Sequence, residues 1–249
     1  MNQHVNRSRP SDPLPAKIPE IHGTTVAAVY YGQRRAGDFY DFLSGNDQRF
    51  WLALFDVAGR LEENRAVVVA LQEKFRACTP DLVRERAGND AEAIIDLWFE
   101  LNRAVLDCAG KVHSCAAFVA CYQEQVHTFC YVNSGHTPGL VRLGQEIREL
   151  SPTAVPLGLF SHSLPECSIL ALGETDAVLL LSRGMVDAQH RGEAYGMERA
   201  KRYLLECGWC DARELCLGIL SRVRDFMQTT PTHDDVTALA LVRSRSESG

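Results

Sequence analysis

The chain has 249 residues, of which 46% are hydrophobic and 23% are charged. This is ordinary globular composition with enough apolar material for one large core, and no low-complexity linker divides the middle. The net charge of -6 argues against a nucleic-acid-binding protein, which usually carries a basic excess. No apolar run approaches the roughly 20 residues that span a bilayer, so we expect no membrane partner.

The two ends of the chain differ in composition from its middle. Residues 1–22 are rich in proline and polar residues and lack the apolar stretch of a secretory signal, so they are predicted to be a disordered lead-in. Residues 244–249 are predicted to be a disordered tail, which leaves one domain over residues 23–243. The nine cysteines are scattered and odd in number, which favours a reducing cytoplasm over a disulfide scaffold.

Hydrophobic periodicity predicts the secondary structure in chain order. Asp90 is placed to cap the second helix. The predicted elements are strands at residues 24–32, 38–43 and 49–57, helices at 66–77 and 91–109, strands at 114–122, 126–133, 139–143, 146–150, 167–172 and 177–182, helices at 196–207 and 211–227, and a last strand at 236–242.

This order of elements predicts the fold class. Strands, then two helices, then many strands, two helices and a strand indicate an α+β fold with largely antiparallel sheets. The helices are amphipathic and need an apolar surface to cover. We therefore expect a four-layer α/β/β/α sandwich, in which two central, mainly antiparallel β-sheets are flanked by pairs of helices.

Aspartates stand at the ends of three predicted strands. Asp38 opens the second strand, Asp56 closes the third after an apolar run, and Asp234 opens the last one. Carboxylates are hard oxygen donors that suit Mg²⁺ or Mn²⁺. A cluster of like charges also needs a cation to neutralise it. Taken singly, Asp38 and Asp234 are more typical of a turn or of a solvated strand start, whereas Asp56 is expected to end a buried strand. None of the three is specific by itself.

Taken together, the aspartates and their surroundings resemble a known family. The chain is similar to the PPM metal-dependent protein phosphatases, in their SpoIIE-type bacterial branch, from about residue 24 to residue 243. The motifs that carry the resemblance are AGDFYD at residues 36–41, FDVAG at 55–59, YVNSGHTP at 131–138, VPLGL at 155–159 and DDVT at 234–237.

The resemblance implies two Mn²⁺ or Mg²⁺ ions and a role for each matching residue. Asp56 would bridge the two metals. Asp38 and the carbonyl of Val57 would bind the second metal, and Asp234 would bind the first. Metal-bound hydroxide would then attack a phosphoserine or phosphothreonine directly, without a phosphoenzyme.

Other residues of these motifs are given supporting roles by the same resemblance. Asp41 and Asp235 are expected to lie behind the metal ligands, and Asn133, Gly135 and His136 are expected to form a structural turn. Arg34 or Arg35 could bind the substrate phosphate as a fork of donors, or could form a solvated charge pair.

Arg183 departs from the family pattern. The segment SRGMVD at residues 182–187 stands where the family has a TDG motif, so arginine replaces an aspartate that binds the first metal. A cation about 5 Å from a divalent ion costs on the order of 6–7 kcal/mol at an effective dielectric of 20. The first site would then be empty, or Arg183 would point away from it, or its guanidinium would replace the ion by pairing with Asp56 or Asp234.

A second departure follows Asp56. The family's small GHG turn becomes the bulkier and more charged segment GRLEEN at residues 59–64. Small residues at this turn would normally let the chain pass close to the metals.

Two functions are therefore predicted. The first is a protein phosphatase whose substrate is a phosphorylated regulatory protein, such as an anti-sigma-factor antagonist in partner-switching signalling. The alternative is a catalytically degenerate module that binds a phosphoprotein or a partner kinase without hydrolysing it.

A third function would use the cysteine pair Cys207 and Cys210, which has the CxxC spacing of redox motifs. The pair stands between two predicted helices instead of between a strand and a helix, so a plain helix–helix turn is the competing and preferred interpretation.

Overall fold

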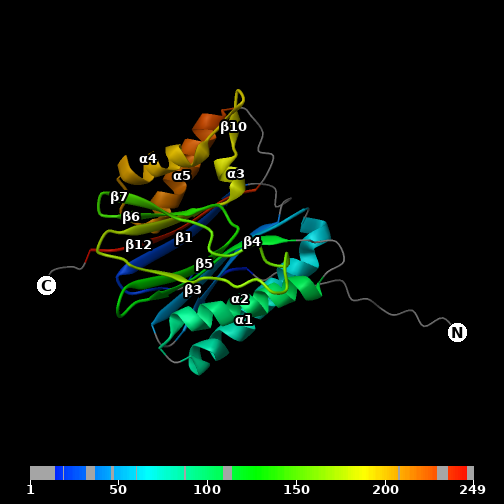
Figure 1. Cartoon of the computed structure of the whole chain (residues 1–249). Helices are drawn as coiled ribbons and strands as arrows, with labels where there is room; N and C mark the ends of the chain where they lie inside the picture. The colour runs from blue at the N-terminus through cyan, green and yellow to red at the C-terminus, as the bar shows by residue number, and fades with distance from the viewer. Residues whose placement is uncertain are drawn as a thin grey trace.

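The computed structural model describes residues 15–18, 20–31, 37–45, 48–59, 61–86, 88–108, 114–206, 208–228 and 235–245. Over these residues the chain forms two five-stranded sheets that pack face to face, with helices on the outer face of each (Figure 1). This confirms the predicted α+β four-layer sandwich. Residues 1–14 and 246–249, which belong to the predicted lead-in and tail, lie outside the described residues.

The sheet that contains both the first and the last strand has the order β1-β12-β9-β6-β7, and we call it the β12 sheet. All its neighbouring strands are antiparallel. Every residue of β12 except the last is buried, because the strand lies inside the sheet with layers on both sides. The strands are β1 (Thr24–Tyr31), β6 (Gly139–Leu143), β7 (Glu146–Leu150), β9 (Ala177–Leu181) and β12 (Val236–Arg243).

The opposing sheet has the order β2-β3-β4-β5-β8, again antiparallel throughout, and we call it the β3 sheet. A small separate hairpin of β10 (Gln189–His190) and β11 (Glu193–Ala194) was not predicted, because strands this short carry no periodic pattern. The strands of the β3 sheet are β2 (Asp38–Ser44), β3 (Arg49–Val57), β4 (Cys115–Gln123), β5 (Thr128–Ser134) and β8 (Ser168–Ala171).

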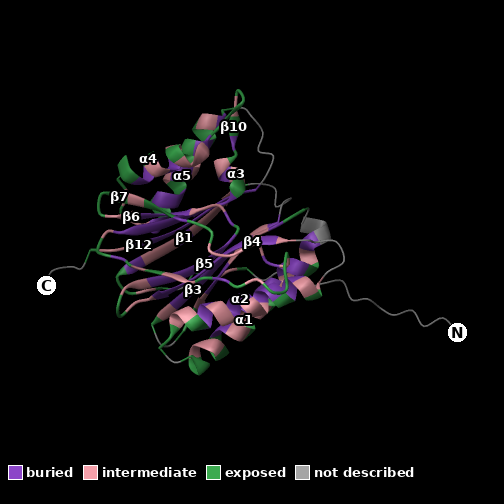
Figure 2. Ribbon diagram, viewed as in Figure 1, coloured by how far each residue is buried: buried purple, intermediate pink, exposed green. Residues whose placement is uncertain are grey.

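The helices form the outer layers. Helices α1 (Leu61–Glu85) and α2 (Asp90–Asp107) cover the β3 sheet, whereas α4 (Gly196–Glu206) and α5 (Ala212–Met227) cover the β12 sheet. A single-turn helix, α3 (Arg183–Val186), follows β9 directly. Buried residues line the sheets and the inner sides of the helices, and exposed residues lie on the outer sides (Figure 2).

Helix α1 is longer than its predicted span of residues 66–77 and continues through Pro80 to Glu85. Proline usually breaks a helix, because it lacks an N–H and its ring crowds the preceding turn. Here the Thr79 hydroxyl donates to the Phe75 carbonyl at 2.6 Å. Leu82 and Val83, beyond the proline, pack against the core under α1. This apolar contact favours continuation of the helix past the proline.

The predicted cap of α2 was wrong by one residue. Asn89 caps the helix, since its side-chain oxygen accepts the backbone N–H of Glu92 at 3.2 Å. Asp90 is instead the first helical residue, and its carboxylate accepts a hydrogen bond from Arg49 Nε at 2.5 Å. The carboxylate that resembled a cap therefore ties α2 to the start of β3.

Three layers of apolar side chains hold the sandwich together. One lies between the two sheets, and the other two lie between each sheet and its helices. Along β3 the even-numbered residues Leu52 and Leu54 face the other sheet, whereas the odd-numbered Trp51 and Phe55 face α1 and α2. This alternation decides which side chains of β2 and β3 can reach the β12 sheet.

Asp41 faces the helices and is fully buried. Arg76 of α1 holds its carboxylate with two hydrogen bonds, from Nε at 2.6 Å and from a terminal nitrogen at 3.0 Å. A third comes from the backbone N–H of Phe42 at 3.0 Å. Asp41 was expected to lie behind the metal ligands, but its carboxylate faces away from the inter-sheet layer and anchors α1 to β2.

Replacing Arg76 by alanine should therefore destabilise the fold. The buried Asp41 carboxylate would lose its countercharge, which costs about 3 kcal/mol, near the lower end for a buried pair because Arg76 is partly exposed. Urea unfolding measures this difference. The matched control is Arg84→Ala, which breaks an exposed pair with Asp81 and should change stability by less than about 1 kcal/mol. Equal effects of the two substitutions would contradict the anchoring role.

Candidate metal centre

Asp38 and Asp56 stand directly opposite each other on β2 and β3. Both are even-numbered residues, and the even-numbered side chains of β2 and β3 face the β12 sheet. Both carboxylates therefore lie at one end of the inter-sheet layer. From the β12 sheet, Thr237 donates its hydroxyl to Asp38 Oδ2 at 3.1 Å. Residues separated by 199 positions are thus brought together between the two sheets.

Ser182 fixes the start of β12 beside these carboxylates. Its backbone N–H donates to the Thr237 carbonyl at 2.9 Å, and the Thr237 N–H donates to Ser182 Oγ at 3.0 Å. The Ser182 hydroxyl also donates to the Asp235 carbonyl at 3.2 Å. The carboxylate of Asp235 is buried and accepts the hydroxyl of Tyr30 at 2.5 Å. These bonds hold Thr237 in place to orient Asp38.

The chain passes very close to itself at Val57. The Val57 N–H donates to the Gly37 carbonyl at 3.2 Å, and a Cβ on Gly37 would lie only 2.0 Å from the Val57 oxygen. Asn64 of α1 reaches the same turn, with its amide nitrogen 2.6 Å from the Ala58 oxygen and 3.4 Å from the Val57 oxygen. Asn64 was not predicted as a site residue, because a single polar residue before the predicted helix carries no motif. It proves to be a buried residue of α1.

Arg183 begins α3 and lies beside the same pair of carboxylates. Its Nε is 3.9 Å from Asp56 Oδ2. The arginine side chain is 60% exposed and the aspartate 15% exposed. Of the two partners that the sequence offered for Arg183, the structure brings Asp56 next to it. The contact is long for an ion pair, and one end of it is in water.

The oxygen atoms on the Asp38 side are suitable ligands for a divalent cation. Two carboxylates and the nearby Val57 carbonyl are hard oxygen ligands of the kind Mg²⁺ and Mn²⁺ prefer. Burial raises the pKa of the adjacent Cys115 thiol well above its usual range, so its sulfur stays protonated and adds no soft, charged ligand. On the Arg183 side the side chain does not suit a cation. A guanidinium offers only N–H groups and positive charge and has no atom that could bind a metal ion.

Asp234, Arg34 and Arg35 lie outside the described residues, as does Cys207. In the part of the chain that the structure describes, no group of three or more His, Cys, Asp or Glu side chains could hold a metal ion. The metal ligands therefore stay a prediction. The structure shows that three of the predicted residues, Asp38, Asp56 and Val57, lie close together.

The residues expected to form a structural turn do so. The Asn133 side chain accepts the His136 N–H at 2.9 Å and donates to the Leu150 carbonyl at 3.0 Å. Gly135 has φ of +69°, and a Cβ there would lie 2.5 Å from Pro156. His136 is 3% exposed, and burial lowers its pKa to about 4. The imidazole is therefore neutral at physiological pH.

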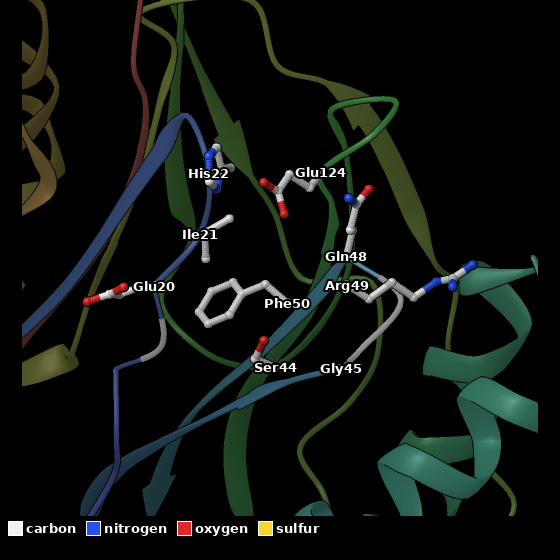
Figure 3. Close-up of a pocket in the computed structure, with 9 residues that line it drawn as sticks. All are labelled: Glu20, Ile21, His22, Ser44, Gly45, Gln48, Arg49, Phe50 and Glu124. Atoms are coloured by element: carbon white, nitrogen blue, oxygen red, sulfur yellow. The ribbon is translucent and has the colours of Figure 1, made fainter.

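A cavity of about 450 Å³ lies elsewhere in the molecule (Figure 3). Its lining includes Ser44 and Phe50, the last residue pair of the β2–β3 hairpin, whereas Asp38 and Asp56 form its first pair. The cavity is thus at the far end of the hairpin from the carboxylates. The residues that line it are Glu20, Ile21, His22, Ser44, Gly45, Gln48, Arg49, Phe50 and Glu124.

The two-sheet, four-layer architecture is the fold of solved PP2C domains. The sequence profile of the family Stage II sporulation protein E (SpoIIE) matches residues 46–244. The chain therefore belongs to the SpoIIE family, as the motifs predicted. No curated protein sequence matches the chain.

Solved structures agree on the fold. The SiaA-PP2C domain of Pseudomonas aeruginosa is 16% identical, with 88% of this chain and 86% of that chain covered and a TM-score of 0.70. The RsbU and RsbW domains of Rv1364c from Mycobacterium tuberculosis are 23% identical, with 91% and 63% covered and a TM-score of 0.68. The phosphatase domain of SpoIIE from Bacillus subtilis is 15% identical, with 91% and 96% covered and a TM-score of 0.65.

Two further findings bear on the predictions. None of the described helices is long and apolar enough to cross a membrane. Cys210 is exposed in the turn between α4 and α5, as the helix–turn interpretation of the CxxC spacing expects.

Adding one methyl group at Gly37 should disturb the site. Gly37→Ala places a Cβ against the Val57 carbonyl, and relief of this overlap should cost about 1–3 kcal/mol of folding stability. Gly208→Ala is the control, because a Cβ at Gly208 meets nothing within 4 Å. Urea unfolding compares the two, and a Gly37 variant as stable as the control would show that β2 and the Val57 turn are not in close contact.

His136 should make stability depend on pH. Between about pH 6.5 and 4 the unfolded chain binds a proton that the buried imidazole does not, so stability falls as the pH falls through this range. At pH 5 the loss is about 2 kcal/mol relative to neutral pH. Urea unfolding of the wild type and of His136→Gln should show a smaller loss in the variant. An NMR titration that finds an ordinary pKa for His136 would refute this prediction.

Proposed function

We propose that the chain is a metal-dependent protein phosphatase that removes phosphate from a phosphoserine or phosphothreonine. The observation that carries the proposal is the convergence of Asp38 and Asp56 between the two sheets, held by Thr237 from the opposite sheet. Membership of the SpoIIE family supports the reaction class. One of the solved neighbours is RsbX in complex with magnesium, which supports Mg²⁺ or Mn²⁺ as the cation.

In this proposal Asp38, Asp56 and the Val57 carbonyl would hold one cation, and Asp234 would serve a second one on the Arg183 side. The cation, when bound, supplies a Lewis acid and water of lowered pKa. The chain's own residues keep the ligands in place. Thr237 orients Asp38, and the Asn64 amide holds the turn that carries the Val57 carbonyl. Arg34 or Arg35 is proposed to bind the substrate phosphate.

The proposed substrate is a phosphorylated regulatory protein, such as an anti-sigma-factor antagonist. Support comes from the solved neighbours, one of which joins RsbU and RsbW domains in a single chain and another of which is described with the bacterial stressosome. A cytoplasmic location fits this role and the free thiols of all the described cysteines.

The position of Arg183 favours a second candidate function. A guanidinium beside Asp56 supplies part of the positive charge that a metal would supply, so the fold could bind a phosphoprotein or partner kinase without turnover. The strength of the Arg183–Asp56 contact bears on which of the two candidate functions is favoured. At 3.9 Å and 60% exposed, this ion pair is worth roughly 0–1 kcal/mol. Arg183 can swing into water at small cost, so we expect it to weaken cation binding without excluding it.

Substitution of Arg183 tests both candidates. Arg183→Asp restores the carboxylate of the family pattern and removes a repulsive charge, so it should lower the Mn²⁺ concentration for half-maximal phosphatase activity at least tenfold, which corresponds to about 1.4 kcal/mol. The assay measures phosphate release from a phosphoserine protein or peptide over a range of Mn²⁺ concentrations. Arg183→Ala should lie between the wild type and Arg183→Asp.

Arg202→Asp is the matched control, because it makes the same charge change on the exposed side of α4 and should not alter the metal dependence. If the wild type shows no phosphatase activity and Arg183→Asp does, the wild-type site is catalytically degenerate because of Arg183. Absence of activity in every variant at saturating Mn²⁺ would count against the phosphatase proposal.

A further inference from the structure

Three cysteines gather on the helix-facing side of the β3 sheet, away from the carboxylates. Cys121 of β4 stands directly opposite Cys130 of β5. On the other side of β5, Cys130 is opposite Ile169 of the edge strand β8. Cys167 lies two residues before Ile169 and packs against the same apolar layer under α1 and α2. It is therefore the diagonal neighbour of Cys130 on one face of the sheet.

The side chains of Cys130 and Cys167 influence each other's ionisation across β5 and β8. The Cys130 thiol donates a hydrogen bond to the sulfur of Cys167, which lowers the pKa of Cys167 and raises that of Cys130. Cys130 is 4% exposed, whereas Cys167 is partly exposed at the edge of the sheet. The two members of the pair thus differ, because Cys167 is both easier to ionise and easier to reach.

We propose that Cys130 and Cys167 are a redox-sensitive pair that closes into a reversible disulfide when hydrogen peroxide reaches the edge of the β3 sheet. The carboxylates and Arg183 take no part in it, so the proposal stands independently of the phosphatase activity. Diagonal neighbours on one face lie about 7–8 Å apart, just beyond the usual span of a disulfide, so closure of the bond requires a small shift of the edge strand β8 toward β5.

The chemistry proceeds in two steps. The Cys167 thiolate attacks one oxygen of the peroxide, so that an S–O bond forms, the O–O bond breaks and hydroxide leaves to take up a proton as water. The sulfur of Cys130 then attacks the Cys167 sulfenic acid, so that an S–S bond forms and the S–O bond breaks. The thiol proton of Cys130 leaves with the hydroxide as a second water. Two thiols and one peroxide give one disulfide and two waters.

Cys121 is the competing partner for Cys130. It is directly opposite on β4 but only 1% exposed. Peroxide meets Cys167 first, and the sulfenic acid formed there has Cys130 as its diagonal neighbour, so the bond is expected across β5 and β8 and not across β4 and β5. Such a bond would fasten β8, whose only sheet neighbour among the described strands is β5, to the interior of the sheet.

Peptide mass spectrometry tests the proposal on the full chain. The reduced protein is treated with hydrogen peroxide, its remaining thiols are alkylated, and trypsin is added without reductant. Trypsin places Cys130 in the peptide of residues 112–142 and Cys167 in that of residues 149–183. We expect these two peptides to be joined, with a mass lower by two hydrogens than their sum, and to separate on addition of dithiothreitol.

Variants decide which thiols form the bond. Cys121→Ser is the matched control and should keep the joined peptides, whereas Cys130→Ser and Cys167→Ser should each lose them. Circular dichroism establishes that each variant is folded. Three outcomes would overturn the proposal: no joined peptides in the wild type, loss of the joined peptides in Cys121→Ser, or oxidation of Cys167 to the sulfinic acid in the wild type without a crosslink.

Discussion

Repulsion between two carboxylates that stand opposite each other on β2 and β3 is the main electrostatic constraint on the candidate site. Asp38 and Asp56 are paired in register and lie at the margin of an apolar layer, where water screens their charges only in part. Such a pair needs compensation from hydrogen-bond donors and positive charge. The surrounding residues supply both, since Thr237 donates to Asp38 and the Arg183 guanidinium lies beside Asp56.

The rest of the sandwich makes this arrangement rigid. The two carboxylates are on one sheet and Thr237 is on the other, so their contact depends on how the sheets stack. Apolar side chains between the sheets fix that stacking, and the Ser182–Thr237 bonds fix the register of β9 against β12 near the site. Asp41, on the opposite face of β2, anchors α1 through Arg76. The two faces of β2 therefore have different roles, since Asp38 belongs to the candidate site and Asp41 binds the helix layer.

The exposure of Arg183 decides how strongly it acts on Asp56. A buried guanidinium in contact with Asp56 would compete strongly with a metal, but an exposed one is stabilised almost as well by water. The side chain belongs to the second case, because more than half of its surface is exposed. In the proposed metal site, this nearby positive charge would lower the affinity for a cation without excluding it.

The sequence by itself determined the strands of the two main sheets, the four long helices, the layered fold and the family, because alternating and helical hydrophobic patterns and short motifs are local signals. It did not determine the end of α1, the cap of α2 or the role of Asn64, and it left two partners open for Arg183. Asp41 and Asp56 both belong to short acidic motifs, yet one pairs with a helix and the other faces the opposite sheet. Only tertiary structure decides this, because strand register and sheet stacking fix which distant residue each carboxylate meets.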